Sequence, residues 1–222
     1  MAKRSYAHVD YTEANKPKKR KLERINASKI DKKGGFFGIT GPNPVDHYKA
    51  YKHILREKSP FKIYEQTPET ARLIKRRTKH IKDPRLSVTI GDVFDVVKTE
   101  PKPGRPPLFV YGHLDFCTTA KVLCRDHDLK KNLEALAQCT NLKNTFFLEM
   151  TFSIWGDKKF STGKNMNLFI LEKYIPMIFR RYGWKVTNPK GHAQKSKGWK
   201  YSRTYRDGCP MINGFYKLER RW

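Results

Sequence analysis

Three acidic side chains stand where predicted strands end, which is where a parallel sheet places its chemistry. They are Glu65 at the end of the strand at 61–65, Asp92 after the strand at 85–90, and Asp115 after the apolar run at 108–111. In open α/β sheets, ligands bind in the crevice outside the carboxyl ends of the strands, and an acid there can hold ribose hydroxyls. The alternatives are a helix cap for Asp115, because Asp is a common N-cap residue, and a surface ion pair for Glu65.

A glycine turn precedes the first of these acids. Gly38 and Gly41 separate a predicted strand at 36–39 from a predicted helix at 47–58. Glycines in such a turn let backbone N–H groups approach a ligand closely at the N-terminus of the following helix. The same Gly-x-x-Gly spacing occurs in ordinary turns, so both interpretations stay open.

The elements that must position these residues alternate between strand and helix. Apolar runs and alternation predict strands at 36–39, 61–65, 85–90, 108–111, 144–154, 184–186 and 211–218. Helical spacing predicts helices at 47–58, 67–80, 93–97, 126–139 and 167–182, and Pro176 should kink the last of them. Such alternation predicts an α/β fold, with a mostly parallel sheet flanked by helices.

The chain is strongly basic along its whole length. Its 222 residues include 47 Lys and Arg against 21 Asp and Glu, a net charge of +26. A field this positive favours a polyanionic partner, and nucleic acid (RNA or DNA) is the usual one. The sequence contains neither an apolar run long enough to cross a membrane nor an apolar signal core at its N-terminus, so we expect no membrane partner.

The charge pattern divides the chain into a basic, disordered N-terminal tail at 1–33 and a domain at 34–222. Like charges in sequence repel and are expected to stay extended until they meet phosphate. The phosphate-binding candidates in the tail are Lys18, Lys19, Arg20 and Lys21. This cluster also resembles a nuclear-localisation signal. We therefore expect an intracellular protein, in the nucleus by that interpretation and otherwise in the cytoplasm.

Two further basic stretches are predicted to contact nucleic acid. The candidates are Lys158 and Lys159 in a loop at 156–165, and Lys195, Lys197, Trp199 and Arg203 in a stretch at 188–206. Basic residues interleaved with aromatic ones suit phosphate contact combined with base stacking. The alternative for the second stretch is a surface hairpin without a ligand.

The four cysteines predict neither a disulfide scaffold nor a metal site. They are Cys117, Cys124, Cys139 and Cys209, and none forms a CxxC pair. Cys117, Cys124 and His127 lie close in sequence, but a fourth ligand at zinc spacing is missing. A reducing compartment is the simpler inference.

The order of these segments resembles that of the class I S-adenosylmethionine-dependent methyltransferases, which have a Rossmann-like fold. The resemblance is carried by the glycine loop at 37–41, the second strand at 63–65, the third at 90–92 and the fourth at 110–115. It covers about residues 35–219. It implies an antiparallel strand pair at the C-terminus, and S-adenosylmethionine as the cofactor.

The resemblance also implies roles for individual residues. The cofactor-binding positions would be Gly38, Gly41, Glu65, Asp92, Val93 and Asp115. Asp115 would orient the methyl acceptor, which we expect to be a nucleic acid. Pyrimidine C5 methylases of this family place a cysteine near that strand end, which makes Cys117 a candidate nucleophile.

Two other functions fit the same residues. The fourth strand lacks the proline pair of amino-methylating enzymes, so the chain could instead bind nucleic acid or a nucleoprotein complex without catalysis, with a protein partner. Alternatively, Asp92, Asp115 and Glu149 could meet and hold Mg²⁺, as in a metal-dependent nuclease.

Overall fold

The computed structural model describes residues 17–41, 44–98, 107–116, 120–153, 166–188, 201–207 and 209–221. Its strands are β1 (Gly35–Ile39), β2 (Phe61–Glu65), β3 (Leu86–Ile90), β4 (Phe109–Asp115), β5 (Leu142–Ser153), β6 (Trp184–Thr187), β7 (Ser202–Asp207) and β8 (Cys209–Arg220). They form one sheet in the order β3-β2-β1-β4-β5-β8-β6, and β7 also pairs with β8. The strands β1 to β5 run parallel, and β8 is antiparallel to β5, β6 and β7. The predicted α/β sheet with its antiparallel C-terminal pair is confirmed.

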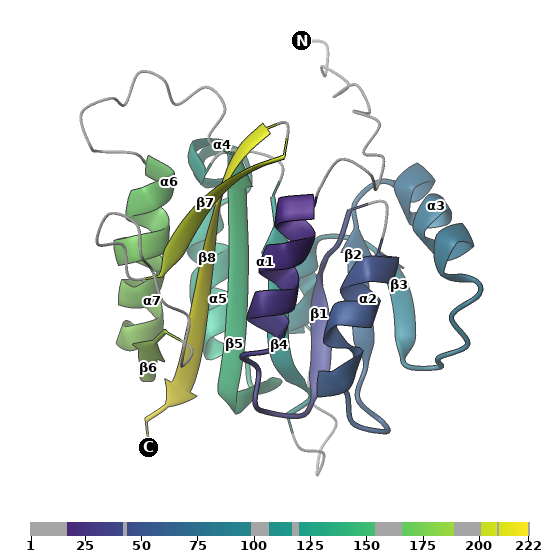
Figure 1. Ribbon diagram of the computed structural model, residues 1–222. Coiled ribbons are helices and arrows are strands. Elements are labelled where there is room, and N and C mark those ends of the chain that lie inside the picture. Colours follow the sequence, from purple (N-terminus) through teal and green to yellow (C-terminus); the bar gives the residue numbers. More distant parts are fainter. Residues whose placement is uncertain are drawn as a thin grey trace.

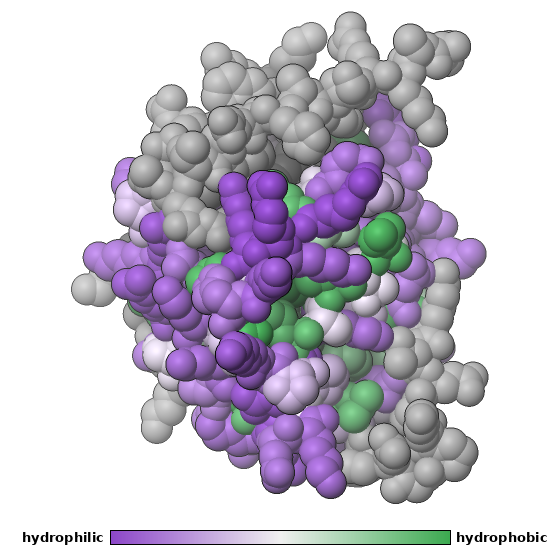
Figure 2. Space-filling model, turned by 90° about the vertical axis from the view of Figure 1, so that its right-hand side faces the viewer, coloured by the Kyte–Doolittle hydropathy of each residue, from purple (hydrophilic) through white to green (hydrophobic). Residues whose placement is uncertain are grey.

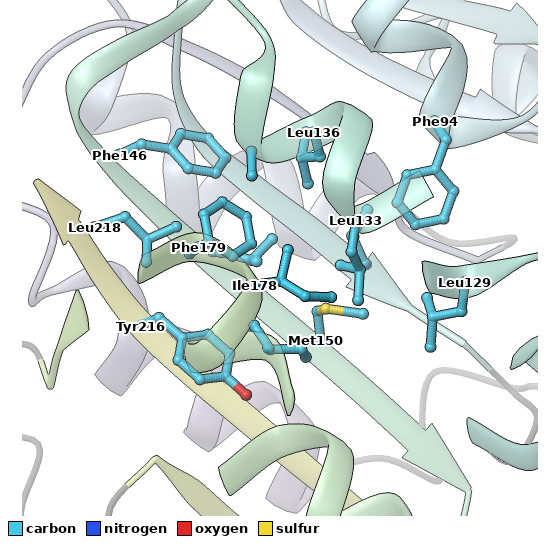
Figure 3. Packing of buried hydrophobic residues seen from close by; sticks show 14 of the residues in the cluster. Phe94, Leu129, Leu133, Leu136, Phe146, Met150, Ile178, Phe179, Tyr216 and Leu218 are labelled. Atoms are coloured by element: carbon cyan, nitrogen blue, oxygen red, sulfur yellow. The ribbon is translucent and has the colours of Figure 1, made fainter. Parts of the chain in front are cut away.

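Alternating side chains give the sheet two apolar faces. In β1, Phe36 belongs to one hydrophobic cluster and Phe37 to the other; in β5, Phe147 and Phe146 divide in the same way. Because successive side chains of a strand point to opposite faces, the two clusters lie on opposite sides of the sheet. Figure 3 shows one of them, where side chains of β5 and β8 meet those of the helices behind the sheet.

The helices cover both faces of the sheet. They are α1 (Pro17–Ala27), α2 (Val45–Tyr51), η2 (Lys52–Ile54), α3 (Pro68–Thr78), η3 (Val93–Lys98), α4 (Ala120–Asp126), α5 (Leu129–Gln138), α6 (Met166–Phe169), η5 (Ile170–Tyr174) and α7 (Ile175–Arg181). In Figure 1, α1 and α2 lie in front of the sheet and α5 lies behind it. Among the described residues, no helix has the length and apolar character needed to cross a membrane.

The predicted helix at 167–182 is divided into three parts. A π-helical turn, η5, separates α6 from α7, and Pro176 stands in the first turn of α7. Proline lacks an N–H group and is tolerated at the first turn of a helix, where no intrahelical acceptor is needed. The irregularity expected at Pro176 is therefore placed in the turn before it.

The structure corrects the prediction of an extended basic tail for residues 17–33. Residues 17–27 form α1, which contacts α2 and β7. Its inward face carries Leu22 and Ala27 together with buried polar residues. The apolar face is too narrow to be read from hydrophobic spacing, and the buried charges have their partners elsewhere in the chain.

The C-terminal hairpin is a second difference. The basic stretch at 188–206 is predicted to contact nucleic acid, with a surface hairpin as the alternative, and no strand is predicted in it. Residues 202–207 form β7, which pairs with the first half of β8. The long strand β8 thus has β5 along one edge, and β6 and β7 share the other edge at its two ends. The side chain of Arg203 is outside the described part, so its predicted contact with nucleic acid stays a prediction.

One partly buried ion pair ties α2 to the start of β3. Asp83 accepts hydrogen bonds from Arg85 Nε (2.9 Å), Arg85 Nη2 (2.7 Å) and the Tyr48 hydroxyl of α2. The hydrogen bonds from Arg85 hold the pKa of Asp83 well below its usual range. A carboxylate held in this way stabilises the folded state as long as it stays ionised.

We predict that Asp83→Asn lowers the free energy of unfolding by about 2 kcal/mol at neutral pH, the magnitude of hydrogen bonds to a charged group. The pKa of Asp83 is depressed on folding, so its contribution is present above the unfolded pKa of about 3.9 and is lost as the pH falls below it. In urea denaturation, the difference in free energy of unfolding between the variant and the wild type should become smaller in acid. An exposed-site control, Asp31→Asn, should show no gap, and an undiminished gap in acid would contradict the prediction.

Candidate functional site

A row of polar side chains crosses the sheet at the carboxyl ends of β4 and β5. His113 of β4 pairs in register with Glu149 of β5, and Asp115 pairs with Thr151. Thr151 pairs in turn with Asn213 of β8. Partners in register project from the same face of a sheet, and all five residues are buried. The polar row lies under α1 and α2, whose own charged residues complete it.

Lys19 of α1 is bonded to Asp115, the predicted catalytic acid. Its ammonium donates to Asp115 Oδ2, and both side chains are almost fully buried. One turn later on the same helix, Glu23 Oε1 lies 3.7 Å from the Lys19 ammonium. A buried charge is tolerated only with a partner, so Lys19 is committed to the protein interior. The structure thus argues against the prediction that Lys19 contacts phosphate.

Glu149 receives hydrogen bonds from several elements. Its Oε2 accepts from the Tyr111 hydroxyl and, at 3.1 Å, from the Tyr51 hydroxyl, while its Oε1 accepts from Asn213 Nδ2 at 2.7 Å. Burial, reinforced by the Glu149 charge, raises the pKa of both tyrosines well above 10, which keeps them as donors. Burial alone would raise the pKa of Glu149, but His113 outweighs it and lowers this pKa.

Two histidines and Glu23 meet in the middle of this region. His47 Nε2 of α2 lies 3.0 Å from Glu23 Oε1 and 3.2 Å from His113 Nε2. Burial alone would raise the pKa of Glu23, but His47 and Lys19 lower it to about 2. Burial lowers the pKa of His47; for His113 the opposing charge of Glu149 prevails and raises the pKa.

We call the six ionisable residues of this region the buried polar cluster. Its members come from α1, α2, β4 and β5, and they are Lys19, Glu23, His47, His113, Asp115 and Glu149. The cluster lies where β4 ends, at the edge of the sheet where α1 begins (Figure 1).

The predicted cofactor residues stand on three neighbouring strand ends. Gly41, after β1, has a left-handed φ of +68°, and a side chain built there would meet no atom of the described residues within 4 Å. Glu65 Oε1 accepts from the backbone and hydroxyl of Thr67, both at 3.1 Å, at the start of α3. Asp92 accepts from Phe94 N at 2.9 Å and from Gln66 Nε2 at 3.3 Å. Glu65 and Asp92 are the two acceptors of this group, and both are partly exposed at their strand ends.

Packing accounts for two other predicted cofactor residues. Gly38 lies inside β1, where an added Cβ would approach the carbonyl oxygen of His113 to 2.3 Å. Val93 is 3% exposed and packs in the hydrophobic core. These are the roles that the structure shows, and their contact with a cofactor stays a prediction.

Solved structures with the same arrangement of strands and helices are methyltransferases. NSun6 from Pyrococcus horikoshii matches with a TM-score of 0.54 at 9% identity, over 89% of this chain and 51% of that one. TYW2 from M. jannaschii, solved with AdoMet, matches with 0.50 at 12% identity, over 97% and 80%. A SAM-dependent methyltransferase from Aquifex aeolicus matches with 0.50 at 12% identity, over 92% and 94%. Neither a protein-family model nor a curated protein sequence matches the chain.

This chain has the class I methyltransferase fold. The sheet order decides it, because β8 inserts antiparallel between β5 and β6 beside a parallel β3-β2-β1-β4-β5 half. Such a sheet binds its ligand beyond the carboxyl ends of its strands, at the point where strand order reverses. Here the order reverses between β1 and β4, with Gly41 on one side and Asp115 on the other.

In this methyltransferase fold, the acids proposed for a nuclease do not assemble. Asp115 and Glu149 share the buried polar cluster, but Asp92 follows β3, which β2 and β1 separate from β4. Three strand spacings amount to about 14 Å. Within the part of the chain described, Asp92, Asp115 and Glu149 form no group able to hold a metal ion.

Several predicted residues lie outside the described residues. They are the possible nucleophile Cys117 and the nucleic-acid candidates Lys158, Lys159, Lys195, Lys197 and Trp199. Cys124 and His127, which lie close to Cys117 in sequence, are both exposed. In the predicted basic cluster, Lys18 and Lys21 are exposed, and Arg20 pairs with Asp46 at 2.8 Å.

The sequence patterns did not identify Glu23, His47 and His113 as residues of a site. One signal was present: Lys19, Glu23 and Asn26 recur at helical spacing on one face of α1. A polar stripe of this kind is read as a solvated face, and only the positions of His47 and His113 show that it is buried.

We predict that Lys19→Met destabilises the protein by about 3–5 kcal/mol, because it leaves a buried carboxylate without its partner. The matched substitution Lys18→Met removes the neighbouring exposed charge and should change stability by under roughly 0.5 kcal/mol. Adding Asp115→Asn to Lys19→Met should restore part of the loss in urea denaturation. Equal stability of the two single variants would contradict a buried ion pair.

Proposed function

We propose that the chain is a methyltransferase that takes its methyl group from S-adenosylmethionine and transfers it to nucleic acid. The observation that carries the proposal is the sheet order, with β8 antiparallel between β5 and β6. The carboxyl ends of β1, β2 and β3 support it as well, because the glycine and acceptor residues of the predicted cofactor site lie there.

The residues at this edge fit the cofactor. At Gly41, the backbone is left-handed and no described residue lies within 4 Å of the Cβ position, which suits the close approach of a ligand to the main chain. Glu65 uses only Oε1 in its bonds to Thr67, which leaves Oε2 for a ribose hydroxyl. Asp92, on the next strand end, would accept from the adenine amino group. The cofactor would supply an electrophilic methyl group, and these residues would hold it beside the end of β4.

Asp115 would orient the methyl acceptor at the end of β4. Its Oδ2 is bonded to Lys19, which fixes the carboxylate in place. Holding donor and acceptor in line supplies a large share of the rate in a two-substrate transfer. Cys117 stays the candidate nucleophile for an acceptor carbon.

The nucleic-acid acceptor is inferred from charge. Besides the net charge of +26, α3 and the turn after it carry exposed basic residues, which are Arg72, Lys75, Arg76, Arg77 and Lys79. Figure 2 views the molecule from the α3 side, where the described surface is mostly hydrophilic. A field of this sign concentrates a polyanion at the surface.

We predict that calorimetry detects binding of S-adenosylmethionine, and that Glu65→Ala weakens it roughly 10-fold through the lost hydrogen bonds to a charged acceptor. Glu69→Ala, which removes the same charge from an exposed position of α3, should leave the affinity unchanged.

Absence of binding at millimolar cofactor would refute the proposal for the isolated chain. If the chain binds the cofactor but transfers no radiolabelled methyl group to RNA or DNA, the result would favour a binding protein without catalysis. Equal weakening by Glu65→Ala and Glu69→Ala would remove Glu65 from the site.

For nucleic acid, we predict that Lys75→Ala combined with Arg76→Ala lowers the salt dependence of binding. If both residues contact phosphate of duplex DNA, the slope of log K against log salt should decrease in magnitude by about 1.8. Lys130→Ala with Lys131→Ala removes two exposed charges from α5 and serves as the matched pair. Equal slopes for the two double variants would exclude α3 as the contact surface.

A further inference from the structure

Three nitrogen and oxygen atoms converge inside the buried polar cluster from three separate elements. They belong to Glu23 of α1, His47 of α2 and His113 of β4, and each of these residues offers one ligand atom within 4.8 Å of the other two. His47 Nε2 lies 3.0 Å from Glu23 Oε1 and 3.2 Å from His113 Nε2. Tetrahedral coordination with zinc–ligand bonds near 2.1 Å places neighbouring ligand atoms about 3.4 Å apart.

Protons alone do not satisfy these contacts. His47 Nε2 faces the carboxylate of Glu23 and the ring nitrogen of His113 at once, and it can carry one hydrogen. If Nε2 carries a hydrogen and donates it to one neighbour, no hydrogen bond is left for the other. If Nε2 carries no hydrogen, it is an acceptor that faces the carboxylate oxygen, which is also an acceptor. Glu23 Oε1 is buried and lies 3.0 Å from His47 Nε2, but no donor among the described residues directs a hydrogen at it with hydrogen-bond geometry.

The charge of the six cluster residues also suits a cation. Glu23, Asp115 and Glu149 are three buried carboxylates, and among the cluster residues Lys19 is the one side chain with a fixed positive charge. Counted over these six residues alone, the net charge is two negative charges when both histidines are neutral. A single divalent cation balances them, and neutral imidazole is the form that binds metal.

The second ring nitrogen of His113 is held as metal-binding histidines usually are. His113 Nδ1 lies 3.4 Å from Glu149 Oε2 and 3.2 Å from the Tyr111 hydroxyl. A carboxylate behind a histidine fixes the ring and directs its other nitrogen at the metal. In this structure that nitrogen points to Glu23 and His47.

We propose that Glu23, His47 and His113 bind one divalent transition-metal ion, of the Zn²⁺ or Fe²⁺ type, that fastens α1 and α2 to β4. Two imidazoles and one carboxylate form a donor set that both ions accept, with the remaining position open to water. The site is independent of the cofactor edge, and its role is to hold the N-terminal helix over the end of β4.

The test uses the full chain. After desalting, elemental analysis should find about one ion per chain, since a site enclosed during folding retains its metal. Chelation should lower the thermal midpoint and added Zn²⁺ should restore it. Co²⁺ added to the chelated protein should give the visible absorption of a low-symmetry protein site. These three measurements need no variant.

Variants then assign the ligands. His47→Gln and Glu23→Gln should lose the bound ion, and Glu149→Gln should weaken it roughly 10- to 100-fold. His127→Gln, which removes an exposed histidine outside the cluster, should retain it. A metal-free protein with no thermal response to Zn²⁺ and no Co²⁺ absorption would overturn the proposal. So would a bound ion that survives in His47→Gln or disappears in His127→Gln.

Discussion

The ion pair between Lys19 and Asp115 closes the end of β4, and the surrounding structure depends on it. A charge in a protein interior is costly unless its partner is present, and here the two charges belong to segments 96 residues apart in sequence. The docked α1 supplies the charge that stabilises Asp115 in its buried position, and β4 supplies a carboxylate for the buried Lys19. Docking of α1 and completion of this strand end are therefore one event.

The direction of α1 matches a change from apolar to polar side chains along the sheet. On the face under α1, successive inward positions of β5 change from Phe147 to Glu149 to Thr151. Running the opposite way, α1 places Lys19 and Glu23 at the polar end, while Ala27 and the following Ile30 join the apolar cluster at the other. Either the reverse orientation or a shift of one turn would bring charges onto aromatic rings. The buried polar residues thus specify where the helix lies, and the apolar ones stabilise it there.

Local patterns were sufficient for most of the fold. Strands β2, β3 and β5 follow from alternating or continuous apolar residues, and α3 from its cap and spacing, because the signal for each lies within its own segment. The positions of Glu65 and Asp92 at strand ends followed from the same patterns. The buried polar cluster could not be predicted in this way. The burial of its charged residues becomes evident only from their partners on other elements. A basic helix with two apolar inward residues has the sequence pattern of a solvated tail.

The basic residues at 17–24 therefore point both into the protein and out to the solvent. Lys19 is turned inward to Asp115, whereas Lys18, Lys21 and Arg24 on the other sides of the same helix are exposed. In the proposed function, an anionic partner that binds these outward residues contacts the helix that holds the acceptor end of β4 closed. Its phosphates would add favourable free energy to the docked state alone, because the extended chain presents no fixed array of charges. Partner binding and the position of Asp115 would then be linked through α1, with the cofactor edge on β1, β2 and β3 left unchanged.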